Sequence, residues 1–259
     1  MVQESRSFQL QELREYKIVK ANELIQRSRF SLTAQEYKII SYLISKIKPN
    51  DIEFKHCEFK IGEFCEICGI DQYNGKNFSN IKSAIQKLSD KSLWVKSDDG
   101  TKEILFRWID NAVIDYKSGM VLMIINEFMK PFLLQLKEKF TQYGLYYILP
   151  MKSQYSMRLY ELLKSREYIG NWKVELGEIK RRLSAENYNR YPDFRRKAID
   201  TALREINDFS DISVSYTVAK QGNKVTHLVF QIRGKTDILE RTRTYARIDD
   251  ALNKAHGSV

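Results

Sequence analysis

The chain has 259 residues, and 43% of them are hydrophobic, which is enough for a packed core and excludes a disordered protein. Its formal net charge is +10, which favours a polyanionic partner. Residues 1–135 carry 20 Lys and Arg against 18 Asp and Glu, whereas residues 136–259 carry 23 against 15. No apolar run is long enough to span a bilayer, the N-terminus lacks a signal-peptide core, and three cysteines do not suggest a disulfide framework. We therefore expect a reduced, cytoplasmic protein that does not associate with membranes.

The first half of the chain alternates short helices and hairpins. Residues 1–16 are polar and are expected to be flexible. Thr33 and Glu36 form a capping pattern, and a helical stripe of apolar residues continues to Ile47. A short strand (57–61), a short helix (62–69) and a longer helix from Phe78 follow. Two hairpins come next, at 92–109 and 112–125. We interpret the hairpin at 92–109 as a wing that presents Lys96 and Lys102.

The second half repeats this order of elements. A helix at 156–168 precedes a strand and short helix (173–183), a helix that starts at Pro192, and a hairpin formed by ISVSYTV and THLVFQI. The segment 61–64 (IGEF) aligns with 176–179 (LGEI), and apolar residues of the two longer helices align at a similar offset. We predict an α+β protein with two tandem winged-helix domains related by internal duplication. A chance likeness of element order is the alternative.

The charge and the repeat together predict a domain organisation. We expect a flexible N-terminus at 1–16, an N-terminal winged helix at 17–130, a connection at 131–150 and a C-terminal winged helix at 151–235. Apolar residues near Phe132 suggest that the connection is packed. The charged tail at 236–259 is interpreted as a helical extension, a partner-binding arm or a disordered segment.

The second domain is the more basic copy, so we expect it to be the main reader of DNA. The start of a recognition helix enters the major groove, and a wing contacts phosphates. Arg195 and Arg196 are the best candidates for reading guanine, because a guanidinium can bond O6 and N7 together. The predicted contacts of this domain are Lys180, Arg181, Arg182, Arg190, Tyr191, Arg195, Arg196, Lys197, Arg204, Lys220, Asn223 and Lys224.

The first domain offers a weaker set of DNA contacts. Its predicted contacts are Lys76, Asn77, Asn80, Lys82, Ser83 and Lys87. A single exposed lysine is most simply interpreted as part of a solvated surface without a binding role. A cluster at the start of a recognition helix favours function instead.

No pattern of catalytic residues is present. Cys65 and Cys68 have the spacing of zinc ligands, but no second CxxC accompanies them, so we expect buried thiols and no metal. GIDQYNGKN (69–77) departs from a phosphate-binding loop in its spacing and in the residue after the lysine. The three histidines are too far apart in sequence for the metal-binding pair of a nicking enzyme. We therefore predict a protein that is not an enzyme and needs no cofactor.

Three stretches, residues 19–47, 153–183 and 191–216, resemble the plasmid replication initiator (Rep) family with tandem winged-helix domains. The likeness extends over roughly residues 17–234 and lies in the order and length of elements. It implies sequence-specific binding to origin repeats (iterons) in double-stranded DNA, origin opening and recruitment of host replication proteins. It also implies a homodimer, formed through the N-terminal domain, that represses its own gene and is in equilibrium with an initiating monomer. The alternative is a tandem winged-helix transcriptional regulator without initiator activity.

Overall fold

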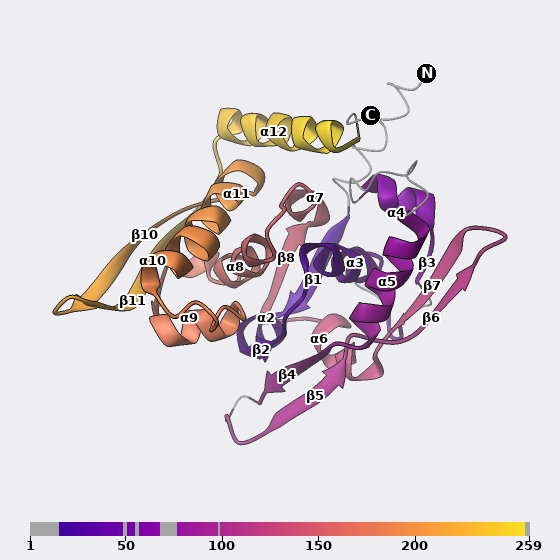
Figure 1. The fold of residues 1–259 in the computed structure, drawn as a ribbon, viewed down its shortest axis with the longest axis horizontal. Helices are drawn as coiled ribbons and strands as arrows, with labels where there is room; N and C mark the ends of the chain where they lie inside the picture. Colours follow the sequence, from indigo (N-terminus) through magenta and orange to yellow (C-terminus); the bar gives the residue numbers. More distant parts are fainter. Residues whose placement is uncertain (1–15, 49–50, 55–56, 68–76, 98, 257–259) are drawn as a thin grey trace.

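The computed structural model describes residues 16–48, 51–54, 57–67, 77–97 and 99–256 (Figure 1). Two units of similar design stand side by side, and a long C-terminal helix lies across one end of the second unit and of the segment between the units (Figure 1). Each unit packs helices against a three-stranded antiparallel sheet. The segment predicted to be flexible, 1–16, lies outside the described residues except for Tyr16.

The first unit contains a capped helix, α3 (Ala34–Ser45), as the sequence predicts. The Thr33 side chain accepts a hydrogen bond from the Glu36 backbone N–H, and the Glu36 carboxylate accepts one from the Thr33 N–H at 2.8 Å. The helices of this unit are α2 (Asn22–Arg27), α3 (Ala34–Ser45), α4 (Ile61–Ile67) and α5 (Asn77–Ser89). Its strands are β1 (Lys17–Ala21), β2 (Ser28–Arg29), β3 (Cys57–Lys60), β4 (Ser92–Lys96), β5 (Glu103–Arg107), β6 (Ile109–Asp115) and β7 (Met120–Ile125).

The second unit repeats this order with fewer additions. Its helices are α8 (Gln154–Lys164), α9 (Leu176–Arg182), α10 (Tyr191–Phe194) and α11 (Thr201–Phe209), with a π-helical segment η3 (Arg195–Asp200) joining the last two. A 3₁₀ turn, η2 (Glu167–Ile169), follows α8. Its strands are β9 (Asn171–Glu175), β10 (Ile212–Gln221) and β11 (Lys224–Gly234).

Sheet pairing confirms the duplication and corrects the expected position of the first wing. In the second unit, β9 runs directly into α9 and pairs with β11, whose hairpin partner is β10. In the first unit, β3 runs directly into α4 and pairs with β7, whose hairpin partner is β6. The β6–β7 hairpin is therefore the counterpart of the second wing. The β4–β5 hairpin, which carries Lys96 and Lys102, belongs instead to a separate sheet with β2.

The connection between the units is packed, as expected. It contains η1 (Glu127–Met129), α6 (Lys130–Leu133), β8 (Phe140–Gly144) and α7 (Leu145–Ile148). Strand β8 pairs with β1 over the whole length of both strands, from Lys17 opposite Gly144 to Ala21 opposite Phe140. The chain thus returns to its first strand before the second unit begins.

Within the charged tail, the structure describes one helix, α12 (Ile238–His256). Ile248 and Leu252 are buried where α12 packs against the second unit. Tyr245 stacks on Tyr147 of α7, with ring centroids 6.4 Å apart and planes 9° apart. Because α7 belongs to the connection, α12 contacts both the second unit and the segment that leads into it.

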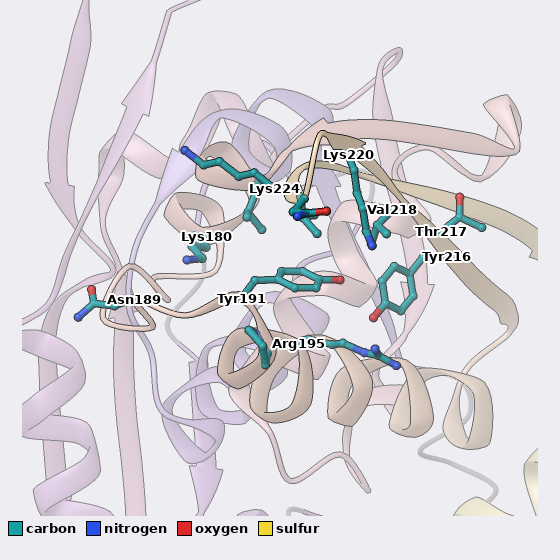
Figure 2. A pocket seen from close by; sticks show the side chains of 13 residues that line it. Lys180, Asn189, Tyr191, Arg195, Tyr216, Thr217, Val218, Lys220 and Lys224 are labelled. Carbon is teal, nitrogen blue, oxygen red and sulfur yellow. The ribbon is translucent and has the colours of Figure 1, made fainter.

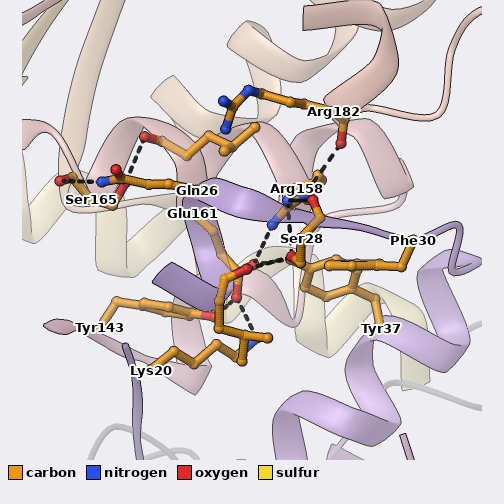
Figure 3. Close-up of polar contacts among 12 residues, drawn as sticks. Lys20, Gln26, Ser28, Phe30, Tyr37, Tyr143, Arg158, Glu161, Ser165 and Arg182 are labelled. Carbon is orange, nitrogen blue, oxygen red and sulfur yellow. Dashed lines mark hydrogen bonds and ion pairs between the residues drawn. The ribbon is translucent and has the colours of Figure 1, made fainter. Parts of the chain in front are cut away.

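A buried polar cluster joins the two units around Glu161 of α8 (Figure 3). Lys20 of β1 donates to its carboxylate at 2.5 Å, and the hydroxyls of Tyr37 in α3 and Tyr143 in β8 donate to it as well. Arg158, one helical turn earlier, donates to the Ser28 carbonyl at 2.9 Å. These contacts fix how the second unit sits against the first.

Candidate nucleic-acid interface

The segment from Tyr191 to Phe209 forms one continuous helical rod in the position of a recognition helix (Figure 1). Pro192 occupies its first turn, where a missing backbone N–H leaves no intrahelical bond unmade. One face is buried through an apolar stripe: Phe194, Ala198, Ile199, Ala202, Leu203 and Ile206. The side chains of Arg195, Arg196 and Lys197 are exposed near its start, as predicted.

An open groove of about 670 Å³ separates the start of this helix from the β10–β11 hairpin (Figure 2). Its basic lining residues are Lys180, Arg195, Lys220 and Lys224. Its remaining lining residues are Leu176, Asn189, Tyr191, Pro192, Tyr216, Thr217, Val218, Asn223 and Val225. No carboxylate is among these lining residues, all of which lie in the described part of the chain. The groove therefore presents positive charge and amide and hydroxyl groups toward solvent.

The Arg195 side chain is held in place at the floor of this groove. Its Nε donates to Asp200 Oδ2 at 3.2 Å, and the Tyr216 hydroxyl donates to Asp200 Oδ1 at 3.0 Å. Burial and the hydrogen bond to Asp200 raise the pKa of Tyr216, so its hydroxyl stays neutral. Figure 2 shows the Arg195 guanidinium lying below the Tyr191 and Tyr216 rings. Asp200 thus orients a guanidinium whose other nitrogens remain available to a ligand.

The tip of the hairpin presents the predicted wing residues. Gly222 adopts φ +59° in the tight turn between β10 and β11, a conformation that favours glycine. Lys220, Asn223 and Lys224 are exposed around this turn. The strand register shifts between Ala219 and Lys220, which marks a bulge that bends the end of the hairpin.

Lys180 lines the groove but has a structural role as well. Its Nζ donates to the Tyr188 carbonyl at 2.6 Å and lies 5.5 Å from the centre of the Phe194 ring. The lysine therefore holds the turn before the recognition helix against the end of α9. Its charge still contributes to the field of the groove.

Several predicted contacts lie outside the groove. Arg181 and Arg182 both bond Glu178, at 2.7 Å each, on another face of α9. Arg196 lies 3.3 Å from Asp193, and the Lys197 ammonium lies 5.9 Å from the Tyr188 ring centre. Arg190 is exposed in the turn just before the helix. These side chains lie beside the groove and do not line it.

Arg204 lies in a different groove, formed by α11, α12 and the loop before α8. Its neighbours there include Lys38 of α3 and Arg247 of α12. The structure therefore separates Arg204 from Arg195, Lys220 and Lys224, with which the sequence had grouped it.

In the first unit, α5 occupies the position of the recognition helix. Its buried stripe is Ile81, Ala84, Ile85 and Leu88, while Asn80, Lys82 and Lys87 are exposed and Ser83 is half-buried. Lys76 and the side chain of Asn77 lie outside the described residues. The matching wing offers Lys117, which is exposed at the β6–β7 turn and was not among the predicted contacts.

Sequence reasoning missed the contribution of strand β10 to the groove. Tyr216, Thr217 and Val218 come from this strand, and only the folding of the hairpin toward the helix brings them there. The alternation in ISVSYTV marks a strand but does not say which face meets the recognition helix.

Within the described ranges, no group of three or more His, Cys, Asp or Glu side chains is arranged to hold a metal ion. Cys57 and Cys65 are buried, whereas His56 and Cys68 lie outside those ranges. The same part of the chain contains no helix with the length and apolar character needed to cross a bilayer.

Comparisons with known proteins agree with this architecture. The family model described as Initiator Replication protein, WH1 matches residues 17–164, and the model described as Initiator Rep protein, WH2 matches residues 175–232. A replication initiation protein from Escherichia coli is 24% identical over 225 residues, which cover 83% of this chain and 69% of that protein. The PI protein of Escherichia coli is 34% identical over 113 residues, or 37% of this chain and 36% of that protein.

A solved structure shares the fold over most of the chain. The crystal structure of Pi initiator protein in complex with iteron DNA matches with a TM-score of 0.70 and 20% identity. The match covers 86% of this chain and 99% of that chain. Because the WH1 model alone spans more than half of the residues and the WH2 model follows it, the chain belongs to the initiator replication protein family with tandem winged-helix domains.

Proposed function

We propose that this protein initiates plasmid replication by binding repeated sites in double-stranded origin DNA. The observation that carries the proposal is the groove between the recognition helix and the wing, which is lined by four basic residues in a chain of the initiator family. The Pi initiator, which shares this fold, was crystallised with iteron DNA. The iteron DNA in that crystal structure supports duplex DNA as the ligand of this chain as well.

The groove suggests how each part would bind DNA. The start of the recognition helix enters the major groove, where Arg195, held by Asp200, reads a guanine edge. Lys220 and Lys224 on the wing neutralise phosphates, which adds affinity on any sequence. The Tyr191 hydroxyl lies between these basic groups and provides a further polar contact with the backbone.

We extend the proposal to the later steps of initiation in the cytoplasm, where plasmid DNA is replicated. Bound protomers bend the origin, and the strain assists melting of adjacent AT-rich DNA without an enzymatic step. The protein then recruits host replication proteins. A homodimer formed through the first domain represses transcription of its own gene, and the monomer initiates.

Replacing Arg195 tests the DNA-binding part of the proposal. We expect Arg195→Ala to weaken binding to the origin repeat on the order of tenfold or more while leaving binding to unrelated duplexes nearly unchanged. Arg243→Ala is the matched control, because Arg243 is an exposed arginine on α12 away from the groove. Fluorescence anisotropy at one fixed salt concentration measures both. Equal losses on specific and unrelated DNA would contradict the role of Arg195 as a base reader.

A plasmid assay separates an initiator from a transcriptional regulator. The gene and its flanking DNA are placed on a plasmid that lacks any other origin. We expect the plasmid to replicate, and we expect the Arg195→Ala version to fail. Absence of replication with intact binding to the flanking repeats would favour the regulator.

A further inference from the structure

Four arginines converge where the first unit meets the second. Arg29 comes from β2, Arg158 from α8, Arg166 from the turn after α8, and Arg182 from the end of α9. Burial, followed by repulsion from Arg182 and Arg158, lowers the pKa of Arg166 to about 10. Burial also lowers the pKa of Arg182, and both Arg158 and Arg29 act in the same direction. The hydrogen bonds place these residues around α8: Arg158 bonds the carbonyls of Ser28, which precedes Arg29, and of Arg182, while Arg166 bonds the carbonyl of Leu162, one turn after Arg158. Arg182 therefore lies within electrostatic range of Arg29, Arg158 and Arg166.

Arg158 is engaged by the protein itself (Figure 3). Its Nη2 donates to the Ser28 carbonyl at 2.9 Å, its Nε donates to the Arg182 carbonyl at 3.3 Å, and its Nη1 lies 3.7 Å from Glu161 Oε2. The guanidinium also stacks on Phe30 at 4.5 Å. Arg158 therefore ties the two units together and is not free to bind a ligand.

The other three arginines have too few carboxylate partners to balance their positive charge. Arg182 Nε bonds Glu178 at 2.7 Å, but Glu178 is shared with Arg181, and Arg182 Nη1 is buried without a hydrogen-bond partner among the described residues. Arg166 donates to the Leu162 carbonyl and to Ser165 Oγ, and its guanidinium lies 4.3 Å from the centre of the Trp172 ring, but it forms no ion pair with any carboxylate in the described ranges. A buried guanidinium N–H without an acceptor is costly, so this arrangement favours an added anion.

The cluster is open to solvent on one side. Arg29 is exposed and forms no ion pair within the described part of the chain, while Arg166 and Arg182 are half-buried. The cluster is also close to the recognition helix. Ser184 Oγ, in the turn that leads from α9 to this helix, donates to the carbonyl of Phe30, the residue after Arg29, at 2.9 Å. An anion held here would contact both units and the approach to the recognition helix.

We propose that Arg29, Arg166 and Arg182 form a phosphate-binding site at the junction of the two winged-helix domains. Guanidinium groups match the geometry of phosphate oxygens and bind them through paired hydrogen bonds. The phosphate is supplied either by the backbone of bound duplex DNA or by a free phosphate-bearing small molecule. The site itself rests on the side-chain geometry, and only the DNA source rests on the proposed function.

Thermal unfolding in phosphate tests the site without DNA. The full chain is unfolded in sodium phosphate and in sodium chloride at equal ionic strength. We expect phosphate to raise the Tm of wild type and of the control Arg243→Gln, and to raise it by less than half as much in Arg29→Gln. Arg29 is exposed, so its replacement leaves the fold intact, and Arg182→Gln provides a second variant. An equal phosphate effect in wild type, Arg29→Gln and Arg243→Gln overturns the proposal.

The salt dependence of DNA binding then identifies the source of the phosphate. Each phosphate contact contributes about 0.9 to the slope of log K against log salt concentration. If DNA supplies the phosphate, the slope for Arg29→Gln falls by about that amount relative to Arg243→Gln. An unchanged slope, combined with the lost phosphate effect on Tm, assigns the site to a free anion. If the chain binds no duplex at all, the proposed function fails while the Tm comparison still tests the site.

Discussion

At the scale of single residues, Glu161 carries the polar contact between the two units. It is 1% exposed and accepts hydrogen bonds from Lys20, Tyr37 and Tyr143. Burial alone would raise the pKa of its carboxyl, but Lys20 and Arg158 outweigh burial, so the pKa is lowered. The group is therefore ionised in the folded protein, and its charge is needed by the buried Lys20.

We expect Glu161→Gln to lower the free energy of unfolding by roughly 3–5 kcal/mol, because it leaves the Lys20 ammonium buried without a counter-charge. Urea unfolding followed by circular dichroism measures the change. The control is Glu127→Gln, which removes an exposed carboxylate paired with Lys130 at the surface, and its urea midpoint should stay close to that of wild type. Similar midpoints for the two variants would contradict the structural role of Glu161.

The pH dependence of unfolding provides a second test of the role of Glu161. A carboxyl whose pKa is lower in the folded state contributes stability above its unfolded pKa, and this contribution is lost as the pH falls through the folded value. Wild type should therefore lose more stability than Glu161→Gln between about pH 6 and about pH 3. Parallel losses in the two proteins would mean that Glu161 is not the group responsible.

At the scale of elements, the sequence predicts helices and hairpins well but not their long-range pairing. The capping pattern at Thr33 and the apolar stripe of the recognition helix are local signals, and the structure contains both. Arg195, Lys220 and Lys224 follow from that helix and hairpin and line the groove together. The first wing was misplaced because its identity depends on β3 pairing with β7, more than fifty residues away. Local alternation cannot distinguish that hairpin from β4–β5.

The corrected wing leads to a comparison between two lysines. Lys117 lies at the turn of β6–β7, and Lys102 lies beside the turn of β4–β5. We expect Lys117→Ala to weaken binding to all duplexes and to reduce the slope of log K against log salt concentration by about 0.9, because it removes a phosphate contact of the first wing. Lys102→Ala should bind as wild type does in the same anisotropy titrations. The reverse order would place the first wing at β4–β5 after all.

Helix α12 gives a prediction about packing. Leu252 is 3% exposed, although it lies in a segment that the sequence left open between helix and disorder. We expect Leu252→Ala to lower the free energy of unfolding by about 2–5 kcal/mol through the cavity that it creates. Asn253→Ala, at the neighbouring exposed position, should have little effect in the same urea titration. If both variants match wild type, α12 does not pack as a part of the folded core.

At the scale of the whole molecule, three sets of contacts hold the units in one arrangement. Glu161 of α8 bonds Lys20 of β1, and Arg158 of α8 bonds the Ser28 carbonyl. Strand β8 pairs with β1. Helix α12 packs against α11 and contacts α7 through Tyr245. Lys20 and Glu161 are 141 positions apart in the chain, and Ser28 and Arg158 are 130 apart, so no local pattern predicts these contacts. Composition and repeat spacing predicted two domains, whereas the buried charges that fix their relative position are visible only in the fold.

A fixed arrangement predicts a strict spacing in the DNA. Hydroxyl-radical footprinting first defines the duplex segment that the protein protects, and base pairs are then inserted at the middle of that segment. Since the two recognition helices cannot move apart, insertion of about 5 base pairs, half a helical turn, and of about 10 base pairs, a full turn, should both abolish high-affinity binding. A flexible two-domain tether would tolerate the full turn, because both half-sites then face the same side of the duplex. The same insertions placed outside the footprint are the control and should leave the Kd unchanged, so retained affinity with the central full-turn insertion would show that the junction around Glu161 opens on DNA.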